Sequence, residues 1–196
     1  MKFLLVLALL SNAAFASAKY VPGSYDVDVS HSKVGFEIAH MMISTVEGRF
    51  SKFSGKVELA EKFTDSKFSS NVDINSINTE EPKRDEHLKS PDFFDAAKFA
   101  DMKFESSSVT GTPEAFKIKG KLTIKGVSKD VTFAGKYTGA IVDPYGNQKV
   151  GFSAKTKISR KDFGLTWNKL IENSPAVGDE VTIDLKIEAG HPIAKK

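Results

Sequence analysis

Few residues in this chain have the types and spacing that catalysis or metal binding needs. The candidates are four histidines and the cluster Arg84-Asp85-x-His87. The histidines lack any pairwise spacing typical of metal ligands, and zero cysteines exclude thiolate chemistry, disulfides and Cys-ligated zinc. No nucleophile-elbow, zinc-protease or phosphate-binding glycine motif occurs. We therefore expect no catalytic residue and no metal. The four histidines are His31, His40, His87 and His191.

Three places could instead contact a bound molecule. His40 ends an apolar strand face, so it could bond a ligand headgroup or be a hydrogen-bonded histidine at the rim of a sheet. Arg84 and His87 could line a mouth or form salt bridges on a helix surface. Trp167, the only tryptophan, could anchor the core or line a ligand site.

The composition places these residues in a single packed domain. The chain has 196 residues, of which 40% are hydrophobic and 27% charged. A formal net charge of +3 is too small for a nucleic-acid footprint, so we expect no nucleic-acid partner. The unusual feature is 15 phenylalanines.

The N-terminus has the pattern of a secretory signal peptide. Lys2 precedes a short apolar run, and small residues follow up to Ala16-Ser17-Ala18, which has the A-x-A form of a cleavage site. The run is too short to span a membrane core, which takes about 20 residues. We expect residues 1–18 to be removed and residues 19–196 to form one domain. An exported chain without cysteine favours a bacterial periplasm.

Most of the remaining chain alternates between apolar and polar residues, as half-buried strands do. Short turns between the alternating segments favour antiparallel neighbours. About eight or nine strands are expected, all with one solvent-exposed face. The clear ones cover residues 33–40, 116–125, 131–141, 149–158 and 180–188, and weaker ones cover 24–29, 48–59, 67–75 and 102–109.

One segment lacks this alternation and predicts a short helical insertion at about residues 79–95. Asn78 followed by Glu81 is a plausible helix N-cap, and Pro91 should end the helix by Ser90.

A sheet of about eight strands must close into a barrel or fold into a sandwich. Gly120, Gly135 and Gly139 fall on apolar faces, where they either permit a bend or leave space. If a cavity exists, its lining is apolar and nearly free of charge, which suits an amphiphile with a long apolar tail. The phenylalanines on those faces are Phe36, Phe104, Phe116, Phe133 and Phe152. The outward lysines 117, 119, 121 and 125 could meet an anionic membrane or form a solvated face.

Several motifs resemble those of the YceI-like family of exported lipid-binding proteins, over about residues 25–189. The signature stretch is Arg84-Asp85-x-His87-Leu88-x-Ser90-x-Asp92-Phe93-Phe94-Asp95, followed by Phe99 and Phe104. Similar stretches are His40-x-Met42-x-Ser44-x-Val46-x-Gly48-x-Phe50, Gly120-x-Leu122-Thr123-Ile124-x-Gly126 and Ile158-Ser159-Arg160-x-Asp162-Phe163-Gly164. The chain departs from the family at Ala100, where proline often follows Phe99, and at Ser128, where threonine is usual.

The resemblance implies an all-β, eight-stranded antiparallel barrel of lipocalin-like shape with an elongated apolar tunnel. It implies a periplasmic binding or carrier protein for a long-chain amphiphile, such as a polyisoprenoid, isoprenoid quinone or fatty amide, with no catalysis and no cofactor other than that ligand. The expected ligand-binding residues are Phe36, His40, Phe93, Phe94, Phe104 and Phe152, with Arg84 and His87 nearer the mouth and Trp167 added from its own position.

Two other functions stay open from the sequence. A filled barrel could be a structural or interaction module, and an apolar rim could equally pair two copies as a homodimer. An enzyme acting on a lipid would need an acid–base group inside the barrel, for which His40 and His87 are the candidates.

Overall fold

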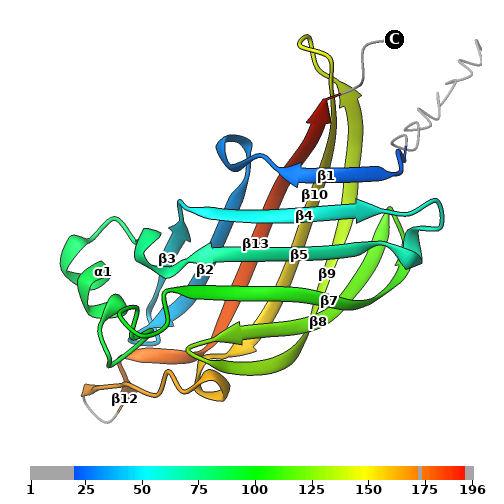
Figure 1. Ribbon diagram of the computed structural model, residues 1–196. Helices are drawn as coiled ribbons and strands as arrows, with labels where there is room; N and C mark the ends of the chain where they lie inside the picture. The colour runs from blue at the N-terminus through cyan, green and yellow to red at the C-terminus, as the bar shows by residue number, and fades with distance from the viewer. Residues whose placement is uncertain (1–19, 172–173, 193–196) are drawn as a thin grey trace, which may run out of the picture.

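The computed structural model describes residues 20–171 and 174–192, and the predicted signal peptide lies outside them. This part of the chain is built of antiparallel strands with one α-helix (Figure 1). The strands are β1 (Gly23–Val27), β2 (Lys33–His40), β3 (Ser44–Phe50), β4 (Phe53–Leu59), β5 (Lys67–Asp73), β6 (Ile77–Asn78), β7 (Asp101–Thr112), β8 (Ala115–Ile124), β9 (Val127–Val142), β10 (Asn147–Ser159), β11 (Leu170–Ile171), β12 (Ser174–Pro175) and β13 (Val177–Pro192). Helix α1 spans Pro82–Lys89, and the 3-10 turns are η1 (Val29–His31), η2 (Phe63–Asp65), η3 (Ile74–Ser76) and η4 (Arg160–Phe163).

Eight strands close into a barrel in the order β1-β4-β5-β7-β8-β9-β10-β13. The ring closes because β1 also pairs with β13, with Val27 opposite Ala189. The predicted all-β, eight-stranded antiparallel barrel is therefore confirmed. The first half of β13 pairs with β2 instead, with Ile183 opposite Phe36, and β2 continues into β3 and β6. These three strands extend one wall of the barrel toward α1 (Figure 1).

The predicted alternation decides which side chains face the interior. In β8, Phe116, Ile118, Leu122 and Ile124 are buried. The intervening lysines at positions 117, 119 and 121 are exposed. Because successive strand residues point to opposite faces, each barrel strand gives one apolar side to the interior.

Two local predictions were wrong. The segment 48–59 is not one strand, since β3 ends at Phe50 and β4 starts at Phe53, and backbone at Ser51 bonds to Ser76 instead of a strand neighbour. The N-cap of α1 is Glu81 rather than Asn78, and its side chain accepts a hydrogen bond from the amide of Lys83. A helix starting at Pro82 needs its cap at the preceding residue. The predicted end before Pro91 agrees with the C-cap at Ser90.

The barrel end formed by β1 and the start of β10 is packed with aromatic side chains. Tyr25 and Val150 are fully buried there. The Tyr20 ring packs edge-on against Phe63 and Tyr137, with both pairs of ring centroids 5.7 Å apart. Burial raises the pKa of Tyr137 to about 12. This end of the barrel is closed by its own core.

Among the described residues, no helix has the length and apolar character needed to cross a membrane.

Candidate ligand-binding cavity

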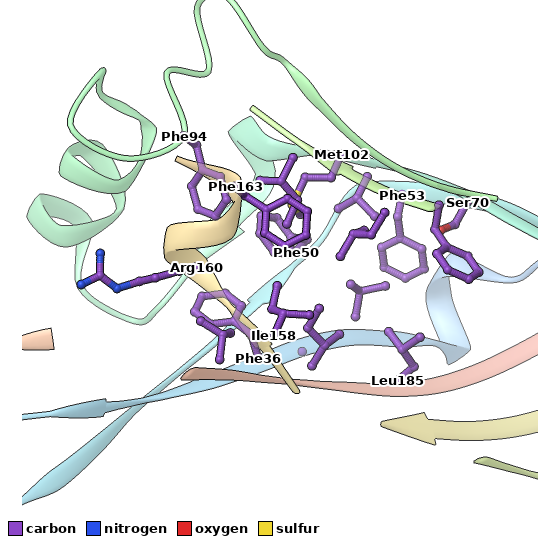
Figure 2. A pocket seen from close by; sticks show the side chains of 18 of the residues that line it. Phe36, Phe50, Phe53, Ser70, Phe94, Met102, Ile158, Arg160, Phe163 and Leu185 are labelled. Atoms are coloured by element: carbon purple, nitrogen blue, oxygen red, sulfur yellow. The ribbon is translucent and has the colours of Figure 1, made fainter. Parts of the chain in front are cut away.

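A cavity of about 520 Å³ occupies the other half of the barrel. Its volume lies within the roughly 300–1,000 Å³ typical of small-molecule sites. Aromatic and aliphatic side chains converge on it from opposed walls, as Figure 2 shows for Phe36, Ile158 and Leu185 on one side and Phe50, Phe53 and Met102 on the other. The barrel is therefore hollow, which contradicts the filled-barrel alternative.

Glycines let the aromatic rings of the wall lie close to neighbouring backbone. A Cβ on Gly48 would lie 2.7 Å from Cε1 of Phe36, and one on Gly120 would lie 2.6 Å from Cζ of Phe104. Both distances are too short for real atoms. The space left by the missing side chain of Gly120 is therefore filled by the ring of Phe104, so this glycine does not leave open space in the cavity.

The mouth of the cavity is framed by α1 and by the loop that follows η4. The His87 ring packs edge-on against Trp167 and Phe93, at centroid distances of 4.8 and 5.0 Å. Its Nε2 lies 2.9 Å from Oδ2 of Asp92. Phe93 and Trp167 are themselves 5.1 Å apart. This aromatic group joins the helix to the loop across the mouth.

Arg84 and Asp85 shape the loop before α1. The Arg84 guanidinium donates to both the hydroxyl and the carbonyl oxygen of Thr79, and the Asp85 carboxylate accepts from the amide and hydroxyl of the same residue. Arg84 and the neighbouring Lys83 also line the cavity. Arg84 thus lines the cavity and bonds to Thr79, and its predicted alternative, a salt bridge on the helix surface, is not seen among the described residues.

Arg160 holds the loop on the opposite side of the mouth. Its side chain is 4% exposed and donates hydrogen bonds to the carbonyl oxygens of Leu165 (2.5 Å), Trp167 (2.8 Å) and Gly178 (2.7 Å). The guanidinium points away from the aromatic side chains of the cavity (Figure 2). Burial lowers the pKa of Arg160, partly offset by Asp179. One buried cation thereby fixes two stretches of backbone next to Trp167.

The structure brings all nine predicted ligand-binding residues to this one cavity. The nine are Phe36, His40, Arg84, His87, Phe93, Phe94, Phe104, Phe152 and Trp167. Lining residues that were not predicted as such include Phe50, Phe53, Phe68, Phe163, Leu165, Lys83 and Arg160. The alternation signal could have found Phe68 and the inward residues of β13. It could not find Phe163 or Leu165, since they lie in a turn and a loop.

A second cluster of charged groups lies outside the cavity. Ligand atoms of Asp28, His31 and Glu188 lie within 4.8 Å of one another. The ammonium of Lys149 sits among them, 2.7 Å from Asp28 and 3.1 Å from Glu188. The cluster therefore already contains its own positive charge.

The lysine row of β8 is also partly engaged. Lys119 and Lys121 both pair with Asp130, at 3.6 and 3.4 Å. Such exposed pairs suit the solvated-face interpretation better than a membrane-binding row.

The cavity itself offers little acid–base chemistry. Among the described residues that line it, no aspartate or glutamate occurs, while Lys56, Lys83, Arg84, Lys103 and Arg160 carry positive charge. A closed barrel with a deep, largely apolar cavity is the architecture of proteins that bind small apolar molecules.

The comparisons with known proteins identify the family. Residues 25–189 match the YceI-like domain, so the chain belongs to the YceI-like family. A UPF0312 protein of Shewanella denitrificans is 36% identical over 188 residues, which cover 94% of both chains.

Solved structures have the same fold. BcnA of Burkholderia cenocepacia is similar with a TM-score of 0.71 and 26% identity, covering 83% of this chain and 98% of that one. A polyisoprenoid-binding domain from Saccharophagus degradans is similar with a TM-score of 0.59, covering 86% of this chain and 98% of that domain. Its identity is 16%, so this likeness concerns the fold alone.

Proposed function

We propose that this protein binds a long-chain amphiphile and carries it through the periplasm, with the tail in the barrel and the headgroup at the mouth. The observation that best supports the proposal is the apolar cavity of about 520 Å³, to whose lining α1 and the Trp167 loop both contribute. Membership of the YceI-like family supports the proposal. The fold that this chain shares with the polyisoprenoid-binding domain of Saccharophagus degradans is compatible with it. The export pattern of residues 1–18 supports the periplasm as the compartment.

The cavity volume limits how much tail it can hold. At about 30 Å³ for each water-sized group, 520 Å³ holds about 17 such groups, or roughly three five-carbon isoprene units. Burying a methylene contributes about 0.8 kcal/mol, so three units contribute roughly 12 kcal/mol. Association costs of at least about 4 kcal/mol leave an affinity in the micromolar range. A tail segment of an isoprenoid quinone, a polyisoprenoid or a fatty amide would fit this volume and supply this burial energy.

The proposal assigns ligand contact to the nine predicted residues and no chemical step to any of them. His40 and His87 line the cavity, and Nε2 of His87 lies 2.9 Å from the carboxylate of Asp92, which does not line it. General acid–base catalysis would need one of these groups to reach a reacting atom of the ligand. Binding alone is the function that this arrangement supports best.

Native mass spectrometry of the protein purified from a bacterial periplasm, followed by solvent extraction, tests the proposal. We expect a stoichiometric adduct that extracts as a long-chain lipid. A clean apo mass, together with no uptake of an added isoprenoid quinone from detergent, would overturn it.

A pair of variants on β13 makes this test specific to the cavity. Ile183→Trp fills the cavity from its wall, whereas Thr182→Trp puts the same side chain at a neighbouring position that does not line it. We expect the first variant to lose uptake at least tenfold, since about 1.4 kcal/mol of lost burial is enough, and the second to keep it. Equal uptake by both variants would show that the ligand binds elsewhere.

A further inference from the structure

Three aromatic rings from different strands close the inner end of the cavity. Phe68 of β5, Phe116 of β8 and Phe152 of β10 all line it. Their ring centroids lie 5.8 Å (Phe68 and Phe152), 6.4 Å (Phe116 and Phe152) and 6.5 Å (Phe68 and Phe116) apart. We call these three residues the floor. Because each ring packs against the other two, the floor is one continuous surface.

A second aromatic layer lies behind the floor. Phe63 packs against Phe116, with ring centroids 5.4 Å apart, and Tyr137 packs edge-on against Phe152 at 5.3 Å. Tyr20 in turn contacts both Phe63 and Tyr137. None of the three residues of this second layer lines the cavity. A tail that reaches the floor therefore meets packed core beyond it.

The strand pairing holds the floor rings at this depth. Tyr137 lies directly opposite Phe152, next to an irregularity in the pairing of β9 and β10 between Gly151 and Phe152. Such irregularities change the direction of the side chains beside them. Phe116 lies opposite Gly135, and a Cβ on Gly135 would lie 2.8 Å from Cε2 of Phe116, which is too close for real atoms. The glycine on the apolar face of β9 thus makes room for a floor ring.

Phe152 is the floor residue that separates the cavity from Tyr137. It is 6% exposed, and its ring packs against Phe68, Phe116 and Tyr137. Removing this ring would leave a gap that opens into the cavity and is lined by apolar side chains. A gap of this kind stays free of water and accepts an apolar group of about the size of benzene. That is about the size of one five-carbon isoprene unit.

We propose that Phe152 sets the length of tail that this protein binds, because the tail ends against its ring. This inference rests on the proposed function, in which the cavity of about 520 Å³ holds roughly three isoprene units. Each unit up to that length buries apolar surface, so it raises the affinity steeply. A further unit finds no space at the floor and stays in water at the mouth. The ligand class is therefore an amphiphile whose buried tail has about 15 carbons.

Binding of prenyl alcohols with two, three, four and five isoprene units tests the proposal. Each alcohol is supplied from detergent, and its apparent Kd is measured by native mass spectrometry. For the unaltered protein we expect the affinity to rise at least tenfold from two to three units, and less than about threefold from three to five. In Phe152→Ala the length limit should move by one unit, so that the fourth unit also raises the affinity at least tenfold.

Phe36→Ala is the matched control, because it removes the same ring from the same cavity near the mouth. The Phe36 ring packs against Phe50 (5.7 Å), and Phe50 packs against Phe94 (6.3 Å), which follows α1. This variant should weaken the binding of all four alcohols by a similar factor and keep the length limit at three units.

Phe152→Leu covers the case in which Phe152→Ala does not fold, which circular dichroism detects. Leucine keeps most of the packing at the floor but is shorter than the phenylalanine ring. We expect the fourth unit to raise the affinity of this variant more than that of the unaltered protein, and less than that of Phe152→Ala.

Three outcomes would overturn this role for Phe152: an affinity that keeps rising beyond three units in the unaltered protein, an unchanged length limit in both Phe152 variants, or an equal shift of the limit in Phe36→Ala. In each of these cases the alcohols still bind, so the proposed function stands without the inference. Binding of no alcohol by the unaltered protein would instead contradict the proposed function, and the inference with it.

Discussion

Phe36 and Gly48 lie opposite each other on β2 and β3, and the aromatic ring covers the glycine so closely that no side chain fits between them. The pair places the Phe36 ring in the cavity wall near the mouth. The absence of a side chain at position 48 thus decides where the Phe36 ring lies in the cavity wall.

Gly48→Ala should therefore push the Phe36 ring into the cavity. We expect a loss of about 1–3 kcal/mol in the free energy of unfolding, as overpacked cores show, together with weaker ligand uptake. Urea denaturation and uptake from detergent measure the two effects. Gly35→Ala, beside Phe36, is the control, since its Cβ would meet mainly the flexible end of Lys33. If both variants behave alike, the contact with Phe36 has no special importance.

Arg160→Met should loosen the loop that carries Trp167. The variant leaves the carbonyl oxygens of Leu165, Trp167 and Gly178 without their buried donor. We expect the free energy of unfolding to fall by about 3 kcal/mol or more, because several buried acceptors lose their partner together. Lys161→Met removes only one half-exposed ion pair and should cost less than about 1 kcal/mol. Similar losses in both variants would contradict this role for Arg160.

The ion pair between Asp28 and Lys149 should stabilise the folded state at neutral pH and lose this effect at low pH. The Lys149 ammonium, with help from Ser30 and His31, holds the pKa of Asp28 well below its usual range. A lowered carboxyl pKa stabilises the folded state above the unfolded value of about 3.9, and this contribution is lost as pH falls further. Asp28→Asn should thus cost about 1 kcal/mol at pH 7 and little at pH 2, as measured by denaturation at each pH. A cost that does not change with pH would argue for packing rather than charge.

Trp167 should report ligand binding by its fluorescence. It is the only tryptophan, and it lines the cavity mouth beside Phe93 and His87. A bound amphiphile replaces water around the indole, so we expect emission to shift to shorter wavelength and saturate at one ligand per protein. Trp167→Phe should abolish the signal while native mass spectrometry still detects the adduct. An emission spectrum that stays unchanged while the adduct forms would place the ligand away from the mouth.

The strands could be predicted because period-two alternation is a local property of each strand, whereas their closure into a barrel was predicted from the resemblance to the YceI-like family. In β8 the alternation separates four buried apolar residues from the exposed lysines without reference to any other strand. The nine candidate residues came partly from that alternation and partly from family motifs, and all nine line the cavity.

The remaining features depend on contacts between distant segments. Arg160 finds acceptors 5 to 19 residues along the chain, in the loop after η4 and at the start of β13. The break between Phe50 and Phe53 is set by the bond from Ser51 to Ser76. The Cβ clash at Gly48 depends on the register of β2 and β3. No local pattern carries such information.

Under the proposed carrier function, the aromatic packing of Tyr20, Tyr25 and Tyr137 affects the order in which the parts of a ligand enter and leave. Since that end of the barrel is filled, a tail that enters at the mouth must leave backwards by the same route. The headgroup is then the last part to arrive and the first to depart. Donor and acceptor would have to meet the protein at the same face and in turn, so delivery would be the reversal of loading rather than passage through the molecule.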